Sequence, residues 1–319
     1  MLKAPFPYFG SKRRVAPLIW KALGQPQHYI EPFFGSGAVL LARPNYNAAT
    51  MIETINDADG FICNVWRALQ AAPDEVAKVC DWPVNHADLI SRRARLIREE
   101  NYLLENLCRD DTWFDVKLAG YWIWAASCWI GSGLTIPNAI PNIGDGGQGV
   151  HAKGQRPHIG DGGKGVQDPY NNNLFTWFRA LSNRLRHVRV ICGDWKRVCG
   201  GAWQTRMGIC GMFFDPPYGV DHREDVYHKE SRTVSAEVRA WCLERGALPD
   251  YRIVLAGYFE EHAALLKHGW TARQWAANGG YAHISAKQTR GDENRKKEAL
   301  FFSPYCIQQQ KQIGFFDND

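Results

Sequence analysis

Residues 27–69 read QHYIEPFFGSGAVLLARPNYNAATMIETINDADGFICNVWRAL, and this stretch decides the fold. Its first part, 27–33, predicts a short strand that runs into a glycine turn, and a helix is expected to start at 38–42. Residues 48–55 predict a second strand, and the run GFICNVWRAL predicts a second helix. Alternation of strand and helix favours a parallel sheet with helices on its faces.

The same alternation resumes in the second half of the chain. Residues 174–188 (LFTWFRALSNRLRHV) have helical spacing, and VRVICGDW (188–195), GICGMFFDPPYG (208–219) and YRIVLAGY (251–258) contain apolar strands. We therefore predict an α/β fold with a Rossmann-like sheet, interrupted by an insertion. The expected division is a catalytic domain made of residues 1–75 and 180–319, and an inserted region, 76–179, of helices and loops.

The inserted region has two parts. Residues 74–130 are expected to be helical, and Arg92, Arg93, Arg95 and Arg98 form a basic cluster there that fits a solvated face and phosphate contact equally well. Residues 131–173 are rich in Gly, Pro and Asn, and IGDGGQGV (143–150) recurs as IGDGGKGV (159–166). Each copy is expected to form a hairpin tip, because Asp-Gly and Gly-Gly favour tight turns. A loop of this length is functional or disordered as a rule.

The charge and the cysteine content of the chain limit which partners, metals and cellular location we expect. The chain has 319 residues and a formal net charge of +5, which is compatible with a polyanionic partner and equally with none. Its nine cysteines form no C-x-x-C pair and no zinc-site spacing, so we expect no metal and a reducing, cytoplasmic location. The N-terminus lacks an apolar signal core.

An uncharged run, 118–136, is long enough to cross a bilayer. It contains three Trp, three Gly and two Ser and is poor in Leu and Ile, so a buried helix that ends at 131–133 is the preferred interpretation. No membrane association is expected.

The glycine motif EPFFGSG, residues 31–37, follows the first predicted strand. Gly35 and Gly37 would let the backbone approach a ligand at the carboxyl end of that strand. The motif is neither G-x-G-x-x-G nor a phosphate-binding loop. Asp57 ends the next strand, where a carboxylate could accept hydrogen bonds from ribose hydroxyls or cap the following helix.

The tetrapeptide Asp215-Pro216-Pro217-Tyr218 carries the strongest chemical signal. It follows an apolar strand, and its two prolines stiffen the backbone and remove two N–H donors. The Asp215 carboxylate and the Pro216 carbonyl are then a pair of acceptors that fits the two N–H donors of an exocyclic amine. Tyr218 offers a face on which an extruded base could stack.

These motifs, in this order, resemble those of the class-alpha (Dam-like) N6-adenine DNA methyltransferases. Three further segments are similar to motifs of that family: PYFGSK (7–12), Asn56-Asp57 and Gly193-Asp194-Trp195. The likeness spans residues 5–70 and 188–220, and more weakly 251–305, whereas 85–173 match only in position. The resemblance implies S-adenosylmethionine as cofactor, bound by Tyr8, Lys12, Glu31, Phe33, Gly35, Gly37, Asp57, Asp194, Trp195 and Asp215.

The resemblance also implies a substrate and a mechanism. Duplex DNA would be the partner, a flipped adenine would stack on Tyr218, and Asp215 with the Pro216 carbonyl would hold N6 for direct methyl transfer, with no metal and no covalent enzyme intermediate. The catalytic set is Asp215, Pro216, Pro217 and Tyr218. Alternatives are an N4-cytosine or RNA-adenine methyltransferase, or a non-catalytic DNA-binding relative. A monomer is the default expectation. Polar residues 227–229 and the basic segment 287–297 fit DNA contact and plain surface loops equally.

Overall fold

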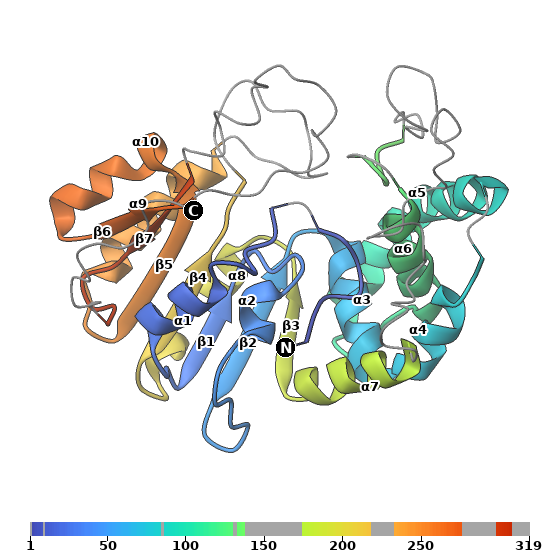
Figure 1. Ribbon diagram of the computed structural model, residues 1–319, viewed down its shortest axis with the longest axis horizontal. Coiled ribbons are helices and arrows are strands. Elements are labelled where there is room, and N and C mark those ends of the chain that lie inside the picture. Colours follow the sequence, from blue (N-terminus) through green and yellow to red (C-terminus); the bar gives the residue numbers. More distant parts are fainter. Residues whose placement is uncertain are drawn as a thin grey trace, which may run out of the picture.

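A computed structural model describes residues 2–8, 10–83, 86–129, 133–137, 174–217, 233–275 and 298–307. Its centre is a seven-stranded sheet with the order β3-β2-β1-β4-β5-β7-β6 (Figure 1). Strands β1 to β5 are parallel, and β7 runs antiparallel to both β5 and β6. The predicted Rossmann-like α/β fold is confirmed.

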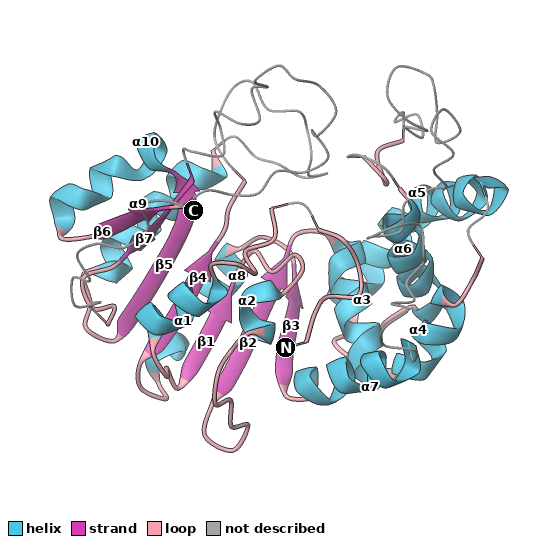
Figure 2. Cartoon of the chain, viewed as in Figure 1, coloured by secondary structure: helices cyan, strands magenta, loops and turns pink. Residues whose placement is uncertain are grey.

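Figure 2 distinguishes the helices, strands and loops of the chain. The strands are β1 His28–Glu31, β2 Ile52–Asp57, β3 Val188–Cys192, β4 Cys210–Phe214, β5 Tyr251–Tyr258, β6 Thr271–Gln274 and β7 Glu298–Phe302. The helices are α1 Ala16–Leu23, α2 Ala38–Leu41, α3 Gly60–Ala71, α4 Pro73–Cys80, α5 His86–Arg109, α6 Val116–Cys128, α7 Leu174–Leu185, α8 Lys196–Cys199, α9 Val234–Gly246 and α10 Phe259–His262. Two 3-10 turns, η3 Trp203–Thr205 and η4 Ala263–His268, complete the described part.

Both faces of the sheet are buried, because successive side chains of a strand point to opposite faces. In β5, Val254 and Ala256 join the core that includes α1, α2 and α3, whereas Ile253 and Leu255 join a second core that includes α8, α9 and η4. Strand β4 (CGMFF) is accordingly apolar along its whole length rather than alternating.

Helices α3 to α7 pack together beyond the β3 edge of the sheet (Figure 1). Arg92 lies inside this group, with its guanidinium carbon 4.6 Å from the ring centroid of Tyr121 and 4.3 Å from that of Trp124. Arg93 donates to backbone carbonyls of residues 134, 136 and 137. A solvated face is therefore wrong for Arg92, which is buried, whereas Arg93 is half-buried. Phosphate contact by this cluster stays a prediction. Arg98 does face solvent, with 68% of its side chain exposed.

Two element boundaries differ from the sequence expectation. Strand β2 begins at Ile52 rather than at 48, because Asn47 turns the chain: its carbonyl accepts from Met51 N at 2.9 Å and its side chain from Ala49 N at 3.0 Å. Helix α6 ends at Cys128, one turn before the predicted 131–133. No helix among the described residues is long and apolar enough to span a membrane. Both IGDGG repeats, 227–229 and 287–297 lie outside the described residues.

Candidate active site

The chain reverses its direction of progress across the sheet between β1 and β4. From β1 it builds outward to β2 and β3, then returns to place β4 on the other side of β1 and continues to β5. Ligands of open α/β sheets bind at such a switch point, beyond the carboxyl ends of the strands. A cavity of about 390 Å³ lies there, lined by residues that follow β1, β2, β3 and β4.

The turn after β1 is shaped by its two glycines. Gly35 and Gly37 adopt φ values of 47° and 61°, in the left-handed region that residues with a Cβ rarely enter. A Cβ on Gly35 would lie 2.5 Å from the Tyr8 ring, so this ring packs directly on the turn. Trp66 of α3 donates its indole N–H to the Gly35 carbonyl at 3.0 Å and fixes the loop from below.

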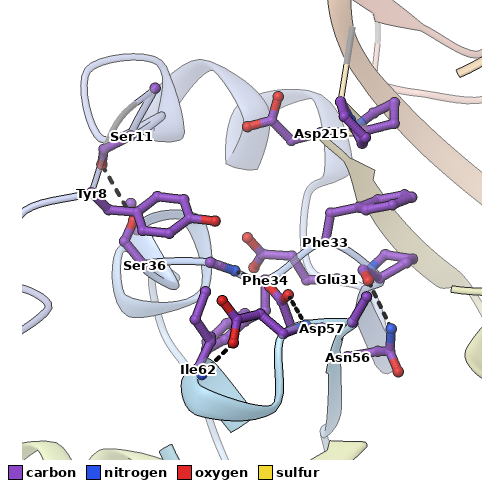
Figure 3. A pocket seen from close by; sticks show the side chains of 18 of the residues that line it. Tyr8, Ser11, Glu31, Phe33, Phe34, Ser36, Asn56, Asp57, Ile62 and Asp215 are labelled. Atoms are coloured by element: carbon purple, nitrogen blue, oxygen red, sulfur yellow. Dashed lines mark hydrogen bonds between the residues drawn. The ribbon is translucent and has the colours of Figure 1, made fainter. Parts of the chain in front are cut away.

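Asp57 stands at the end of β2, facing the glycine turn (Figure 3). Its carboxylate accepts from Gly35 N at 2.8 Å and from Asp59 N at 3.0 Å. Burial, together with the charge of Asp59, raises the pKa of Asp57 to about 7. The N-cap of α3 is Asp59, whose side chain accepts from Phe61 N and Ile62 N, so the interpretation of Asp57 as that helix cap is wrong. Asp59 also lines the cavity.

Asp215 begins the loop that leaves β4 and enters the same cavity. Its Oδ2 lies 2.8 Å from Nζ of Lys12, whose side chain is only 5% exposed. Lys12 also donates to the Gly10 carbonyl at 3.0 Å. Pro216 and Pro217 line the cavity beside the carboxylate. Tyr218 lies outside the described residues.

The other predicted site residues surround this centre. Glu31 is buried, accepts from the Tyr29 hydroxyl at 2.8 Å, and has a pKa raised well above its ordinary value by burial. Phe33 lies with its ring centroid 6.4 Å from that of buried Trp195. Asp194 is exposed and accepts from Lys196 N at 2.8 Å. Figure 3 shows Tyr8, Glu31, Asp57 and Asp215 turned toward a common space from four separate segments.

The cavity is strongly acidic. Among the described lining residues the carboxylates are Glu31, Asp57, Asp59, Asp194, Asp215 and Glu298, and Lys12 is the only basic side chain. Such a set of acceptors suits a ligand with cationic centres and hydroxyl groups, and it is a poor site for a pyrophosphate.

One wall of the cavity is not predictable from the sequence motifs. It consists of Trp122 and Ala126 of α6, Trp129 directly after this helix, and residues 133–136, all from the inserted region. In sequence, these tryptophans carried no signal beyond that of a buried helix, since only the packing of α6 on α3 places them beside the ligand space.

Comparison with known proteins adds one positive finding. Residues 8–103 match the family model described as D12 class N6 adenine-specific DNA methyltransferase. The matched range contains the glycine turn, Lys12 and Asp57, and it ends before β4 and Asp215. A comparison with curated proteins finds no match.

Proposed function

We propose that the chain is a D12 class N6 adenine-specific DNA methyltransferase, the family whose model matches residues 8–103, and that it transfers a methyl group from S-adenosylmethionine to N6 of a flipped-out adenine in duplex DNA. The observation that carries this proposal is the position of Asp215. The carboxylate lies in the same cavity as the glycine turn and Asp57, although the family match does not extend to it.

The residues of the cavity fit the proposed cofactor. Asp57 would accept hydrogen bonds from the ribose hydroxyls, and the surrounding carboxylates would balance the cationic sulfonium and ammonium groups. The left-handed glycines keep the turn above β1 tight, because a Cβ on Gly35 would meet the Tyr8 ring and one on Gly37 would meet the Phe34 ring. We propose that cofactor binding involves Tyr8, Lys12, Glu31, Phe33, Gly35, Gly37, Asp57, Asp194, Trp195 and Asp215. When bound, the cofactor supplies an electrophilic methyl group.

The chemistry of the chain itself lies in the loop after β4. Asp215 and the Pro216 carbonyl would accept the two N–H donors of the adenine amine and orient its nitrogen lone pair, a positioning that lowers the barrier by several kcal/mol. The Lys12 ammonium lies 2.8 Å from one carboxylate oxygen of Asp215, Oδ2, and donates to it. Because Lys12 engages Oδ2, the other carboxylate oxygen can serve the amine, and Asp215 or water can take the released proton.

The remaining parts of the proposal concern the DNA. Tyr218 would stack on the extruded base, which contributes about 1–3 kcal/mol per base in comparable sites. The inserted region, 76–179, would recognise the target sequence, and the catalytic domain would comprise 1–75 and 180–319. The α6 wall adds a second role to the insertion, because it also encloses the cavity.

The first test is methyl transfer from tritiated S-adenosylmethionine to unmethylated duplex DNA of mixed sequence, followed by nucleoside chromatography. We expect label in N6-methyladenine. Asp215→Asn should lower the transfer rate by on the order of 100-fold or more, because a positioned charged acceptor is lost. Asp250→Asn is the matched control, since Asp250 is exposed and precedes β5 at the opposite end of the strands.

The alternatives give distinct outcomes in the same assay. Label in N4-methylcytosine would overturn the base assignment, and label only on RNA would overturn the choice of nucleic acid. Cofactor binding without any transfer to DNA or RNA would contradict the proposed reaction. Equal transfer rates for Asp215→Asn and Asp250→Asn would contradict the role of Asp215.

A further inference from the structure

Arg93 of α5 holds a short segment of the chain at three points. Its Nε donates to the Leu134 carbonyl at 2.9 Å, and its Nη2 donates to the carbonyls of Ile136 and Pro137. Its guanidinium carbon also lies 5.2 Å from the ring centroid of Trp129. One planar side chain therefore ties residues 134–137 to the end of α6.

The segment held by Arg93 is part of the cavity wall. Residues 133–136 line the cavity, and Thr135 is 7% exposed. Gly133 opens the segment with a φ of 90°. Residues 134–137 belong to no helix or strand, and for this stretch the described backbone contacts are few: Ile136 N donates to the Gly133 carbonyl at 3.1 Å. The shape of this wall consequently depends on the guanidinium.

The wall lies on the glycine-turn side of the cavity. Trp122 meets Phe6 edge to face at a centroid distance of 4.9 Å, Phe6 lies 5.6 Å from Trp66, and Trp66 donates to the Gly35 carbonyl. This aromatic chain connects α6 to the turn where we place the cofactor. A shift of the wall is thus expected to change the space around the cofactor before it changes the Asp215 loop.

We propose that Arg93 is a positioning residue for cofactor binding, which acts by fixing residues 134–137 as a wall of the cofactor space. The inference rests on the proposed function and deepens it. Lysine cannot replace arginine here, because a single ammonium does not reproduce a planar fork that reaches separate carbonyls. Arg93→Lys keeps the charge and removes the fork.

The test compares the full-length wild type with Arg93→Lys by calorimetric titration with S-adenosylmethionine and by methyl-transfer kinetics. We expect the Kd and the KM for the cofactor to rise by on the order of tenfold, because a preorganised wall is loosened. The transfer rate at saturating cofactor should stay within about twofold, since Lys12 and Asp215 are untouched. Arg98→Lys, on the exposed face of the same helix, should match the wild type.

The outcomes separate this inference from the proposed function. A folded Arg93→Lys protein with the cofactor Kd and KM of the wild type would overturn the inference alone. A drop in the maximal rate at unchanged KM would also overturn it, because that is the signature of a smaller active fraction. If Arg93→Lys does not fold, Ile136→Ala decides: an unchanged cofactor KM overturns the role of the wall. A wild type that binds no cofactor would instead reject the proposed function.

Discussion

Asp57 gives the cofactor site a pH dependence at the scale of one residue. Its pKa is raised to about 7 by burial and by the charge of Asp59. An ionised carboxylate accepts hydrogen bonds from hydroxyls more strongly than a neutral one. We therefore expect the Kd for S-adenosylmethionine to fall as the pH rises from about 6 to about 8, measured by titration calorimetry at several pH values. A Kd that is constant over this range would contradict the role of Asp57.

Asp59→Asn provides the matched variant for this prediction. Asparagine keeps the N-cap of α3 and removes the neighbouring charge, so the pKa of Asp57 and the midpoint of the binding curve should move to lower pH.

The raised pKa of Asp57 also affects the stability of the folded protein, with the opposite sign to its effect on cofactor binding. Because the folded pKa exceeds the unfolded one, the contribution of Asp57 to the free energy of unfolding is lost as the pH rises from about 4 to about 7.

The order of motifs along the sequence predicted that several acidic side chains would lie at one edge of the sheet. It did not predict which side chains would form direct contacts with each other. Asp57, Asp194 and Asp215 follow three different strands, so a parallel sheet had to bring them to one edge. The contact of Lys12 with Asp215 could not be predicted, because it joins segments 203 residues apart through side-chain rotamers. The surroundings of Arg92 and Arg93 were not predicted for a related reason: their aromatic and carbonyl partners come from α6 and the segment after it.

At the scale of elements, Glu53 of β2 joins α7 to the sheet. Both its oxygens accept from Arg184 of α7, at 2.6 and 2.9 Å, and Arg43 donates to it at 3.1 Å. The Glu53 and Arg43 side chains are fully buried. Glu53→Ala should lower the free energy of unfolding by about 3–5 kcal/mol, because it leaves buried guanidinium charge without a partner. Urea denaturation at pH 7 measures this change.

Asp74→Ala is the control for this prediction. Asp74 pairs with Arg179 of α7 as well, at 2.7 Å, but 59% of the arginine side chain is exposed. Solvent can replace the lost partner there, so we expect a much smaller effect on the midpoint of unfolding. Similar losses in the two variants would show that the buried network does not hold α7 to the sheet.

Several elements with a clear apolar run were predicted within a few residues, whereas α1, β6 and β7 were not predicted. Strand β5 coincides with the predicted 251–258, and β4 and α7 lie inside their predicted segments. Strand β6, with the sequence TARQ, has no apolar alternation, because it is a largely exposed edge strand, and it gave no signal. The start of β2 was misplaced because the Asn47 turn is a hydrogen-bonding event that apolar patterns do not record.

At the scale of the whole molecule, the sequence predicts an insertion between two halves of a sheet. The structure shows that the inserted helices and the sheet share one hydrophobic core. One continuous apolar cluster contains Leu96 of α5 and Trp124 of α6 together with Trp20 of α1 and Val254 of β5. Composition and periodicity cannot show this, since both describe one segment at a time. An insertion that shares its core with its host has no reason to fold alone.

We therefore expect a single cooperative unfolding transition. Tryptophans lie in both parts of the molecule. Among them, Trp113, Trp122 and Trp124 belong to the helical part, and Trp195 and Trp241 lie beside the sheet. Fluorescence should thus follow both parts, and its thermal transition should coincide with that of far-ultraviolet circular dichroism. The calorimetric enthalpy should equal the van't Hoff enthalpy in the same scan. Two resolved transitions, with Leu96→Ala lowering only one midpoint, would instead show that the inserted region is an independent domain and that the α6 wall can move without unfolding the sheet.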